Sequence, residues 1–182
     1  MSNVLKNQRP QSPFLVLTHA MDMRKEITKA LLIDFGYHPE PIELPDLPDN
    51  FDTMEEWQQK NELLKIEKVM NRYETQQGLN EWFLEKSRNA IIDSLMMLMK
   101  NISLANAVYI TNMDEYRERR TYQNRAIGFC GVLAQELQYV IEILPVDVNK
   151  YTRFDKMISE QINLLKGWRK SDNKIKKKLE QG

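Results

Sequence analysis

Two long stretches of this chain carry apolar residues at alternating steps of three and four, a spacing that places side chains along one face of an α-helix. The first stretch presents Ile91, Leu95, Leu98, Ile102, Ala105 and Tyr109. The second presents Ala126, Cys130, Leu133, Leu137, Val140 and Leu144. A helix with such a face must bury it against another element, so the pattern predicts an all-α fold. As a member of this face, Cys130 is expected to be an inert core residue.

Residues that break helices are scarce outside one segment. The chain has only six glycines and seven prolines, and four of the prolines fall within ten positions. Ser12-Pro13 and Gly36 are suitable ends for a first helix, Asp114 is expected to cap a later one, and Pro145 ends that helix. We therefore predict a four-helix bundle. Its helices are expected over residues 12–36, 80–110, 114–144 and 150–170.

The first and last of these helices have apolar faces of their own. In the first helix we expect the buried residues to be Leu17, Ala20, Met21, Ile27, Leu31 and Phe35. In the last helix we expect them to be Tyr151, Phe154, Ile158, Ile162 and Leu165.

The segment between the first two bundle helices, residues 37–79, differs in composition. Its first part, residues 37–51, has too many prolines for a helix or a central β-strand, so we expect an extended arm. The sequence Thr53–Glu56 matches a capping box and predicts an extra helix over 53–77 that stops at Gly78.

Charge is distributed unevenly along a chain whose 182 residues fit within one domain. The formal net charge is zero, from 26 basic and 26 acidic residues. However, residues 37–62 contain eight acids and one base, whereas residues 150–180 contain ten bases and four acids. Such asymmetry bears on partners rather than on fold. We expect a single domain over 1–182, with 37–79 as an insertion and 171–182 as a basic tail.

The sequence lacks the residues that most catalytic and metal sites need. It has no Walker-type glycine loop, no G-x-S-x-G and no H-E-x-x-H motif. The single cysteine excludes an internal disulfide, and with only His19 and His38 no Cys/His zinc site can form, although a carboxylate-only metal site stays open. Gly128 and Gly131 form a G-x-x-G in an apolar helical run, which we interpret as close helix packing. We expect no enzymatic activity and no cofactor.

Nothing in the sequence indicates a membrane. The N-terminal MSNVLKNQRPQSP lacks the apolar core of a secretory signal. Uncharged runs such as 126–135 are far shorter than the roughly 20 residues that a bilayer requires. We therefore expect a cytoplasmic protein with no membrane partner.

Basic residues gather at the start of the helix predicted over 114–144. Arg117 and Arg120 share a helix face, Arg119 lies further round, and Tyr116 and Tyr122 flank them. Arginine binds phosphate oxygens bidentately and aromatic rings stack on unpaired bases, so this face has the chemistry of an RNA-binding surface. The alternative is that these arginines pair with acids of the same segment, at little energetic gain.

A second basic group closes the chain. It consists of Lys166, Arg169, Lys170, Lys174, Lys176, Lys177 and Lys178. So many bases can release counterions from a phosphate backbone, which gives salt-sensitive binding that is indifferent to sequence. A solvated helix end is the alternative.

The stretch NISLANAVYITNMDEYRERRTYQNRAIGFCGVLAQEL, residues 101–137, resembles the accessory variability determinants, which are encoded beside the reverse transcriptases of diversity-generating retroelements. The opening VLKNQRPQSPFLVL and the closing LLKGWRKSDNK are also similar to that family. The resemblance covers roughly residues 12–36 and 88–175, and residues 37–77 look like an insertion. It implies a homopentamer of four-helix bundles with a basic surface. It also implies a non-enzymatic subunit that binds the reverse transcriptase and its template RNA to support mutagenic reverse transcription.

The resemblance and the two basic groups together give the predicted RNA- or polymerase-binding residues. These are Arg117, Arg119, Arg120, Arg125, Lys166, Arg169, Lys170, Lys174, Lys176, Lys177 and Lys178. Familiar members of the family are strongly basic, whereas this chain is neutral because of its acidic insertion. We therefore expect residues 37–62 to serve a protein contact or to shield a basic groove.

Two other functions remain open at this point. One is a helical module for homo-oligomerisation or protein interaction without nucleic-acid binding, in which the acidic arm docks on the basic end of a neighbouring subunit. The other is an RNA-cleaving enzyme that uses arginine and tyrosine side chains, which the missing acid–base pair disfavours.

Overall fold

The computed structural model describes residues 13–39, 41–144, 146 and 148–181. Within this part the chain is all-α, with four long helices packed together and no β-strand, which confirms the predicted fold class. The long helices are α1 (Pro13–Leu31), α2 (Glu56–Ala107), α3 (Met113–Ile143) and α4 (Val148–Leu179). Two short 3₁₀ helices are η2 (Asp34–Gly36) and η3 (Phe51–Thr53).

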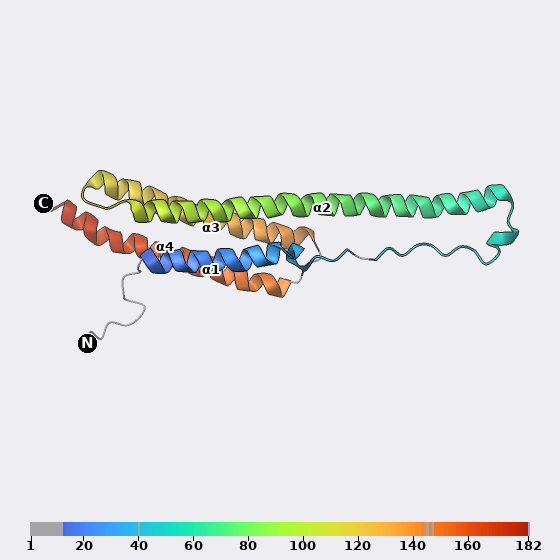
Figure 1. Cartoon of the computed structure of the whole chain (residues 1–182), viewed down its shortest axis with the longest axis horizontal. Coiled ribbons are helices and arrows are strands. Elements are labelled where there is room, and N and C mark those ends of the chain that lie inside the picture. The colour runs from blue at the N-terminus through green and yellow to red at the C-terminus, as the bar shows by residue number, and fades with distance from the viewer. Residues whose placement is uncertain (1–12, 40, 145, 147, 182) are drawn as a thin grey trace.

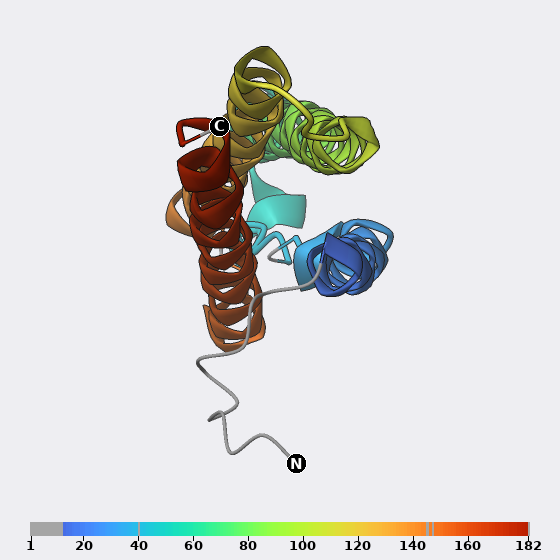
Figure 2. The same cartoon turned by 90° about the vertical axis from the view of Figure 1, so that its left-hand side faces the viewer.

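Successive long helices run in opposite directions, as the chain path in Figure 1 shows. Viewed from the end of the molecule, the four helices surround a common core (Figure 2). Each of them packs against two others, because α1 contacts α2 and α4 while α3 contacts the same two helices. The arrangement is therefore an up-and-down bundle.

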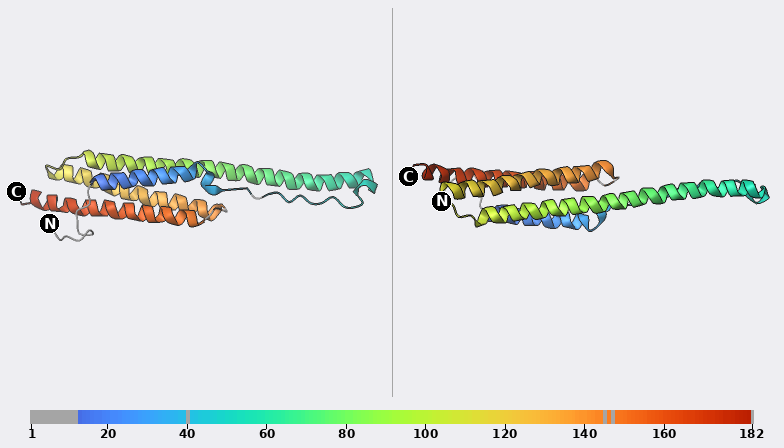
Figure 3. Two further views of the ribbon diagram at one scale, coloured as in Figure 1. Left: turned by 60° about the horizontal axis from the view of Figure 1, so that its bottom comes forward. Right: turned by 90° about the horizontal axis from the view of Figure 1, so that it is seen from above.

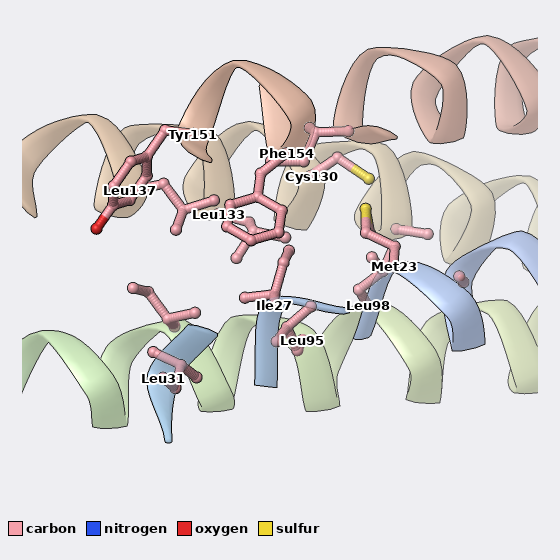
Figure 4. Close-up of a cluster of buried hydrophobic side chains, with 14 of the residues drawn as sticks. Met23, Ile27, Leu31, Leu95, Leu98, Cys130, Leu133, Leu137, Tyr151 and Phe154 are labelled. Atoms are coloured by element: carbon pink, nitrogen blue, oxygen red, sulfur yellow. The ribbon is translucent and has the colours of Figure 1, made fainter. Parts of the chain in front are cut away.

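The core contains nearly all of the side chains that the three-and-four spacing selected. Figure 4 shows side chains from all four helices gathered at the centre of the bundle, among them Ile27, Leu95, Leu133 and Phe154. Every predicted residue on the face of α3, from Ala126 to Leu144, is buried. Burying one such side chain contributes about 1.5–3 kcal/mol. Burial also raises the pKa of the Cys130 thiol to about 12, which agrees with an inert core residue.

Two predicted core residues lie on the surface instead. Tyr109 is 80% exposed because α2 ends two residues earlier, so the side chain is no longer on the helix face. Met21 is 56% exposed because the buried face of α1 passes through Val16 and Met23, on either side of Ala20. The presence of this helix was predicted correctly, but its predicted buried face is rotated slightly from the face that is buried in the structure.

The first helix also ends earlier than predicted. The α-helix stops at Leu31, and residues Asp34, Phe35 and Gly36 then take positive φ values of 47°, 58° and 71°. This turn buries Phe35, whose ring stacks on Tyr151 of α4 at 5.6 Å. The side chain of Asp34 forms an ion pair with Arg88 of α2, which holds the turn against the bundle. The predicted Ser12 cap lies outside the described residues.

A buried polar contact joins α1 to α4. The Nε2 of Gln161 donates to the carbonyl oxygen of Val16 at 3.2 Å, so its Oε1 faces Nδ1 of His19, 2.7 Å away. The other ring nitrogen, Nε2, lies 3.4 Å from Oε2 of Glu160. We assigned His19 no role from the sequence, and the structure uses it in packing.

The predicted extra helix over 53–77 is not a separate element. It is the first part of α2, which continues without a break through Gly78 for 52 residues. A glycine inside a helix costs about 1 kcal/mol relative to alanine, which is not enough to end a long helix. The cap was also misplaced: the backbone N–H of Glu55 donates to Gln58 Oε1, whereas the Thr53 hydroxyl donates to the Asn50 carbonyl.

The first part of α2 extends well beyond the bundle (Figures 1 and 3). Residues 56–83 of this helix, with residues 37–39 and 41–55 alongside, form what we call the stalk. Residues 37–39 and 41–48 are neither helix nor strand, which confirms the predicted extended arm over these residues. The predicted end at residue 51 is wrong, because a turn at 49–50 and η3 follow. At its base Tyr37 accepts a hydrogen bond from Asn80 at 2.7 Å, and near its tip Gln59 Nε2 donates to the Phe51 carbonyl at 2.9 Å.

The last helix is longer than predicted. It continues to Leu179, so the expected basic tail over 171–182 is helical for most of its length. Lysine is a good helix former, and the buried Asp172 keeps this part of α4 packed against α3.

The helix α3 has a long apolar window. Among the described helices, α3 is the one whose length and composition would allow it to cross a membrane, with a mean hydropathy of 1.2 over 18 residues. Helices of soluble bundles pass the same test, so one such helix is weak evidence for a membrane. Gly128 and Gly131 lie on the exposed side of α3, and an added Cβ at either would meet nothing within 4 Å. The prediction that these glycines let another helix of the same chain pack closely is therefore wrong.

The continuity of α2 can be tested at Gly78. Replacing it with alanine (Gly78→Ala) should raise the free energy of unfolding by about 0.5–1 kcal/mol, because the site is helical and has space for a methyl group. The control is Gly36→Ala, where the positive φ should make the same change destabilising. Urea unfolding followed by circular dichroism measures both. A loss of stability in Gly78→Ala would contradict a continuous helix.

Candidate nucleic-acid interface

The arginine-rich start of α3 is fixed by a strong helix cap. Asn112, not the predicted Asp114, is the cap: its Oδ1 accepts hydrogen bonds from the backbone N–H groups of Asp114 and Glu115 at 2.9 and 3.0 Å. Glu115 reaches back and accepts from the backbone and hydroxyl of Thr111 and from the backbone of Asn112. These bonds lower the pKa of Glu115, the Thr111 hydroxyl having the largest effect.

Arg119 points into the protein. Its guanidinium donates to the carbonyl oxygen of Val108 through Nε, at 3.0 Å, and through Nη2. Nη1 lies 3.4 Å from Oδ1 of Asp172, and the two side chains are only 13% and 5% exposed. The guanidinium also lies 6.0 Å from the ring centre of Trp168. Arg119 thus joins the end of α2 and the start of α3 to α4.

Further polar contacts complete this junction between α3 and α4. Buried Gln123 donates through Nε2 to Oδ2 of Asp172 at 2.8 Å, and the Tyr116 hydroxyl donates to Asn173 Oδ1 at 2.9 Å. Burial raises the pKa of Asp172, while Gln123 and Arg119 oppose that effect. We call Tyr116, Arg119, Gln123, Asp172 and Asn173 the polar junction.

This junction was not predicted from the sequence. WRKSDNK is a basic segment, and it also contains the aspartate and the asparagine that bind α3. The sequence signal that could have revealed the junction is Asp172, a single acid among lysines that lies four residues after Trp168 and so on the same helix face. The sequence could not show which of the arginines that acid would pair with.

Two more of the predicted arginines hold the same helices together. Arg120 Nη1 donates to the carbonyl oxygen of Arg169 at 2.8 Å, and its guanidinium lies 6.0 Å from the ring centre of Tyr116. Arg169 in turn donates to Asn124 Oδ1 at 2.9 Å. Neither contact is the pairing with neighbouring acids that we considered as the alternative. Only Arg117 follows that alternative, because it pairs with Asp114 at 3.0 Å.

The remaining predicted bases are turned towards solvent. Lys176 pairs with Glu180 at 3.2 Å. The others are exposed, and no ion pair or hydrogen bond of their side chains occurs in the described part of the chain. These are Arg125, Lys166, Lys170, Lys174, Lys177 and Lys178.

Four of these lysines share one face of α4. At 100° per residue, Lys166, Lys170, Lys174 and Lys177 fall on the side opposite the buried Trp168. We call these four residues the lysine ridge. An α-helix with lysines at this spacing offers a row of positive charges about 17 Å long.

No group of three or more histidine, cysteine, aspartate or glutamate side chains suited to a metal occurs in the residues that the structure describes. Comparison with known proteins gives no further guide to the site. No protein family, no curated protein and no solved structure matches this chain.

The buried and exposed ion pairs should differ sharply in energy. Asp172→Ala leaves the buried Arg119 without its carboxylate and should lower the free energy of unfolding by about 3 kcal/mol. The matched control, Asp114→Ala, breaks the pair with Arg117, in which both side chains are at least 70% exposed, and should cost less than about 1 kcal/mol. Urea unfolding of both variants measures the difference. Equal losses would mean that Asp172 is not essential to the junction.

The cap on α3 makes stability depend on pH. The pKa of Glu115 is lower in the folded protein than in the unfolded chain, so its contribution is present above the unfolded value and is lost as the pH falls through the folded value. Glu115→Gln should therefore be less stable than the wild type at neutral pH. The gap should narrow on acidification, as urea unfolding at neutral and acidic pH would show. A gap that stays constant would exclude a role for the carboxylate charge.

Proposed function

We propose that this protein is a non-enzymatic accessory subunit of a diversity-generating retroelement, which binds the reverse transcriptase and its template RNA and supports mutagenic reverse transcription. The observation that carries the proposal is the lysine ridge. Its four ammonium groups are exposed, lie on one helix face and have no ion-pair partner among the described residues. The resemblance of residues 101–137 to the accessory variability determinants supplies the retroelement and the polymerase.

The RNA contacts are assigned to the exposed bases. The lysine ridge and the neighbouring Lys178 would bind phosphate oxygens, and the exposed Arg125 and Arg117 on α3 would extend the surface. Arg119 does not join this group, because its donors are used within the polar junction. Arg120 and Arg169 are half-buried and hold α3 to α4, so they position the surface rather than form its centre.

The proposed assembly is a homo-oligomer in the cytoplasm, and five subunits is the number that the resemblance implies. The protein would act by binding alone, without a cofactor, while the polymerase carries out the chemistry. The supporting observations are a bundle core filled by apolar side chains and a surface that separates acidic from basic residues.

The proposal predicts a salt-dependent affinity for RNA that the lysine ridge provides. Against a labelled single-stranded RNA of mixed sequence, Lys166→Ala, Lys170→Ala and Lys174→Ala combined should reduce the slope of log K against log salt by about 2, since each lost phosphate contact removes about 0.7. The control combines Lys86→Ala, Lys100→Ala and Lys156→Ala, which are exposed elsewhere. Filter binding at several salt concentrations measures both.

RNA binding and co-purification together separate the accessory subunit from an interaction module without nucleic-acid binding. If the wild type retains no RNA at low salt and does not co-purify with a co-expressed retroelement reverse transcriptase, the accessory-subunit proposal fails. An interaction module without nucleic-acid binding would then remain.

A further inference from the structure

The arm carries acidic residues at every third position. Glu43, Asp46, Asp49 and Asp52 are all exposed, and we call them the acidic edge. Ile42, Pro48 and Phe51 are half-buried, whereas Pro45 is exposed. A proline-rich extended chain turns once in about three residues, so Glu43 and Asp46 lie along one side of it. Asp49 follows in the turn at 49–50 and Asp52 in η3. The arm therefore presents its carboxylates to solvent, while Phe51 at its far end accepts a hydrogen bond from Gln59 of α2.

The acidic edge has no counter-charge on its own arm. Residues 37–55 contain no lysine or arginine, and none of the four acids forms an ion pair with any described residue. Leu44 and Leu47, between these acids, are also about 45% exposed. A strip of this kind is a surface for a positively charged partner.

The chain's own basic surface lies at its other end. In Figures 1 and 3 the stalk extends to one end of the molecule and the last turns of α4 reach the opposite end. The bundle separates the two, and α2 is a single helix that cannot fold back. The acidic arm therefore does not shield the basic surface of its own chain, which corrects that expectation. The protein instead has one strongly acidic end and one strongly basic end.

We infer that the acidic edge of one copy docks on the lysine ridge of a second copy. The two charges are of similar size, with a net of −7 in residues 37–62 and +6 in residues 150–180, and the whole chain sums to zero. A second copy supplies this complementary surface at equal concentration, with no other partner required.

Such a contact joins two different surfaces and is therefore heterologous. Each copy gives its stalk to one neighbour and its ridge to another, which produces a closed ring or an open chain according to the angle between neighbours. The inference rests on the proposed homo-oligomer and names the surfaces through which its subunits meet. It also makes the stalk of a neighbour a competitor of RNA for the same lysines.

The test uses two charge-reversal variants of the full-length chain. One combines Glu43→Lys, Asp46→Lys and Asp49→Lys, and the other combines Lys166→Glu, Lys170→Glu and Lys174→Glu. All six side chains are exposed and have no partner among the described residues, so the bundle should be unaffected, which circular dichroism checks. The control combines Lys86→Glu, Lys100→Glu and Lys156→Glu, which changes the net charge as much as the ridge variant does.

Analytical ultracentrifugation then measures self-association. The wild type and the control should associate at about 50 mM salt and dissociate at about 500 mM, because the contact is between exposed charges. Each reversal variant alone should associate at least about 10-fold more weakly, since like charges then face each other. An equimolar mixture of the two reversal variants should regain association, because lysines on one stalk meet glutamates on the other ridge.

The outcomes are decisive and separate from RNA binding. A wild type that stays monomeric at low salt, or reversal variants that associate as the wild type does, would overturn the inference. A mixture of the two reversal variants that fails to associate would also overturn the inference. A basic partner protein would then be the alternative ligand of the acidic edge. The stalk variant keeps the lysine ridge, so it should still bind RNA. If the wild type itself binds no RNA, that result would count against the proposed function and not against the docking of one copy on another.

Discussion

The structure depends on one apolar face that runs the length of α2. Its second half, from Leu84 to Ala105, packs against α1 and α3 and is buried. Its first half, which includes Ile66, Val69 and Tyr73, is half-buried and continues the same spacing along the stalk. Because the helix does not stop between the two parts, the stalk continues directly from the bundle. The length of the molecule and the distance between its charged ends both follow from this.

The polar junction has a different role from the core. Burying the Arg119 guanidinium and the Asp172 carboxylate carries a large cost of desolvation, which their mutual attraction and the bonds to Val108 and Gln123 offset. The apolar face of α4 would tolerate several positions against α3, whereas a buried ion pair permits one. Three junction residues, Tyr116, Arg119 and Gln123, lie within residues 101–137, the segment on which the proposed function relies.

The separation of charge is the property that links the two proposals. An acidic edge and a lysine ridge within one neutral chain would attract each other if they could meet, but the continuous α2 prevents this within one molecule. Both surfaces are therefore available to other molecules. The ridge can bind a polyanion or the stalk of a second copy, and the salt dependence of both contacts follows from the exposure of the charges.

The sequence by itself determined the class of fold, the core and the extended arm. Periodic residues such as Leu98 and Leu133 must be buried by any helix that carries them, and the prolines of 37–51 exclude a helix whatever surrounds them. Only the tertiary structure decided which charges are free. Arg119 and Lys170 look alike in sequence, and what separates them is whether a partner such as Asp172, 53 residues along from Arg119, arrives beside them. The same holds for Gly78, because a local break signal of about 1 kcal/mol cannot compete with a helix face that is packed on both sides of it.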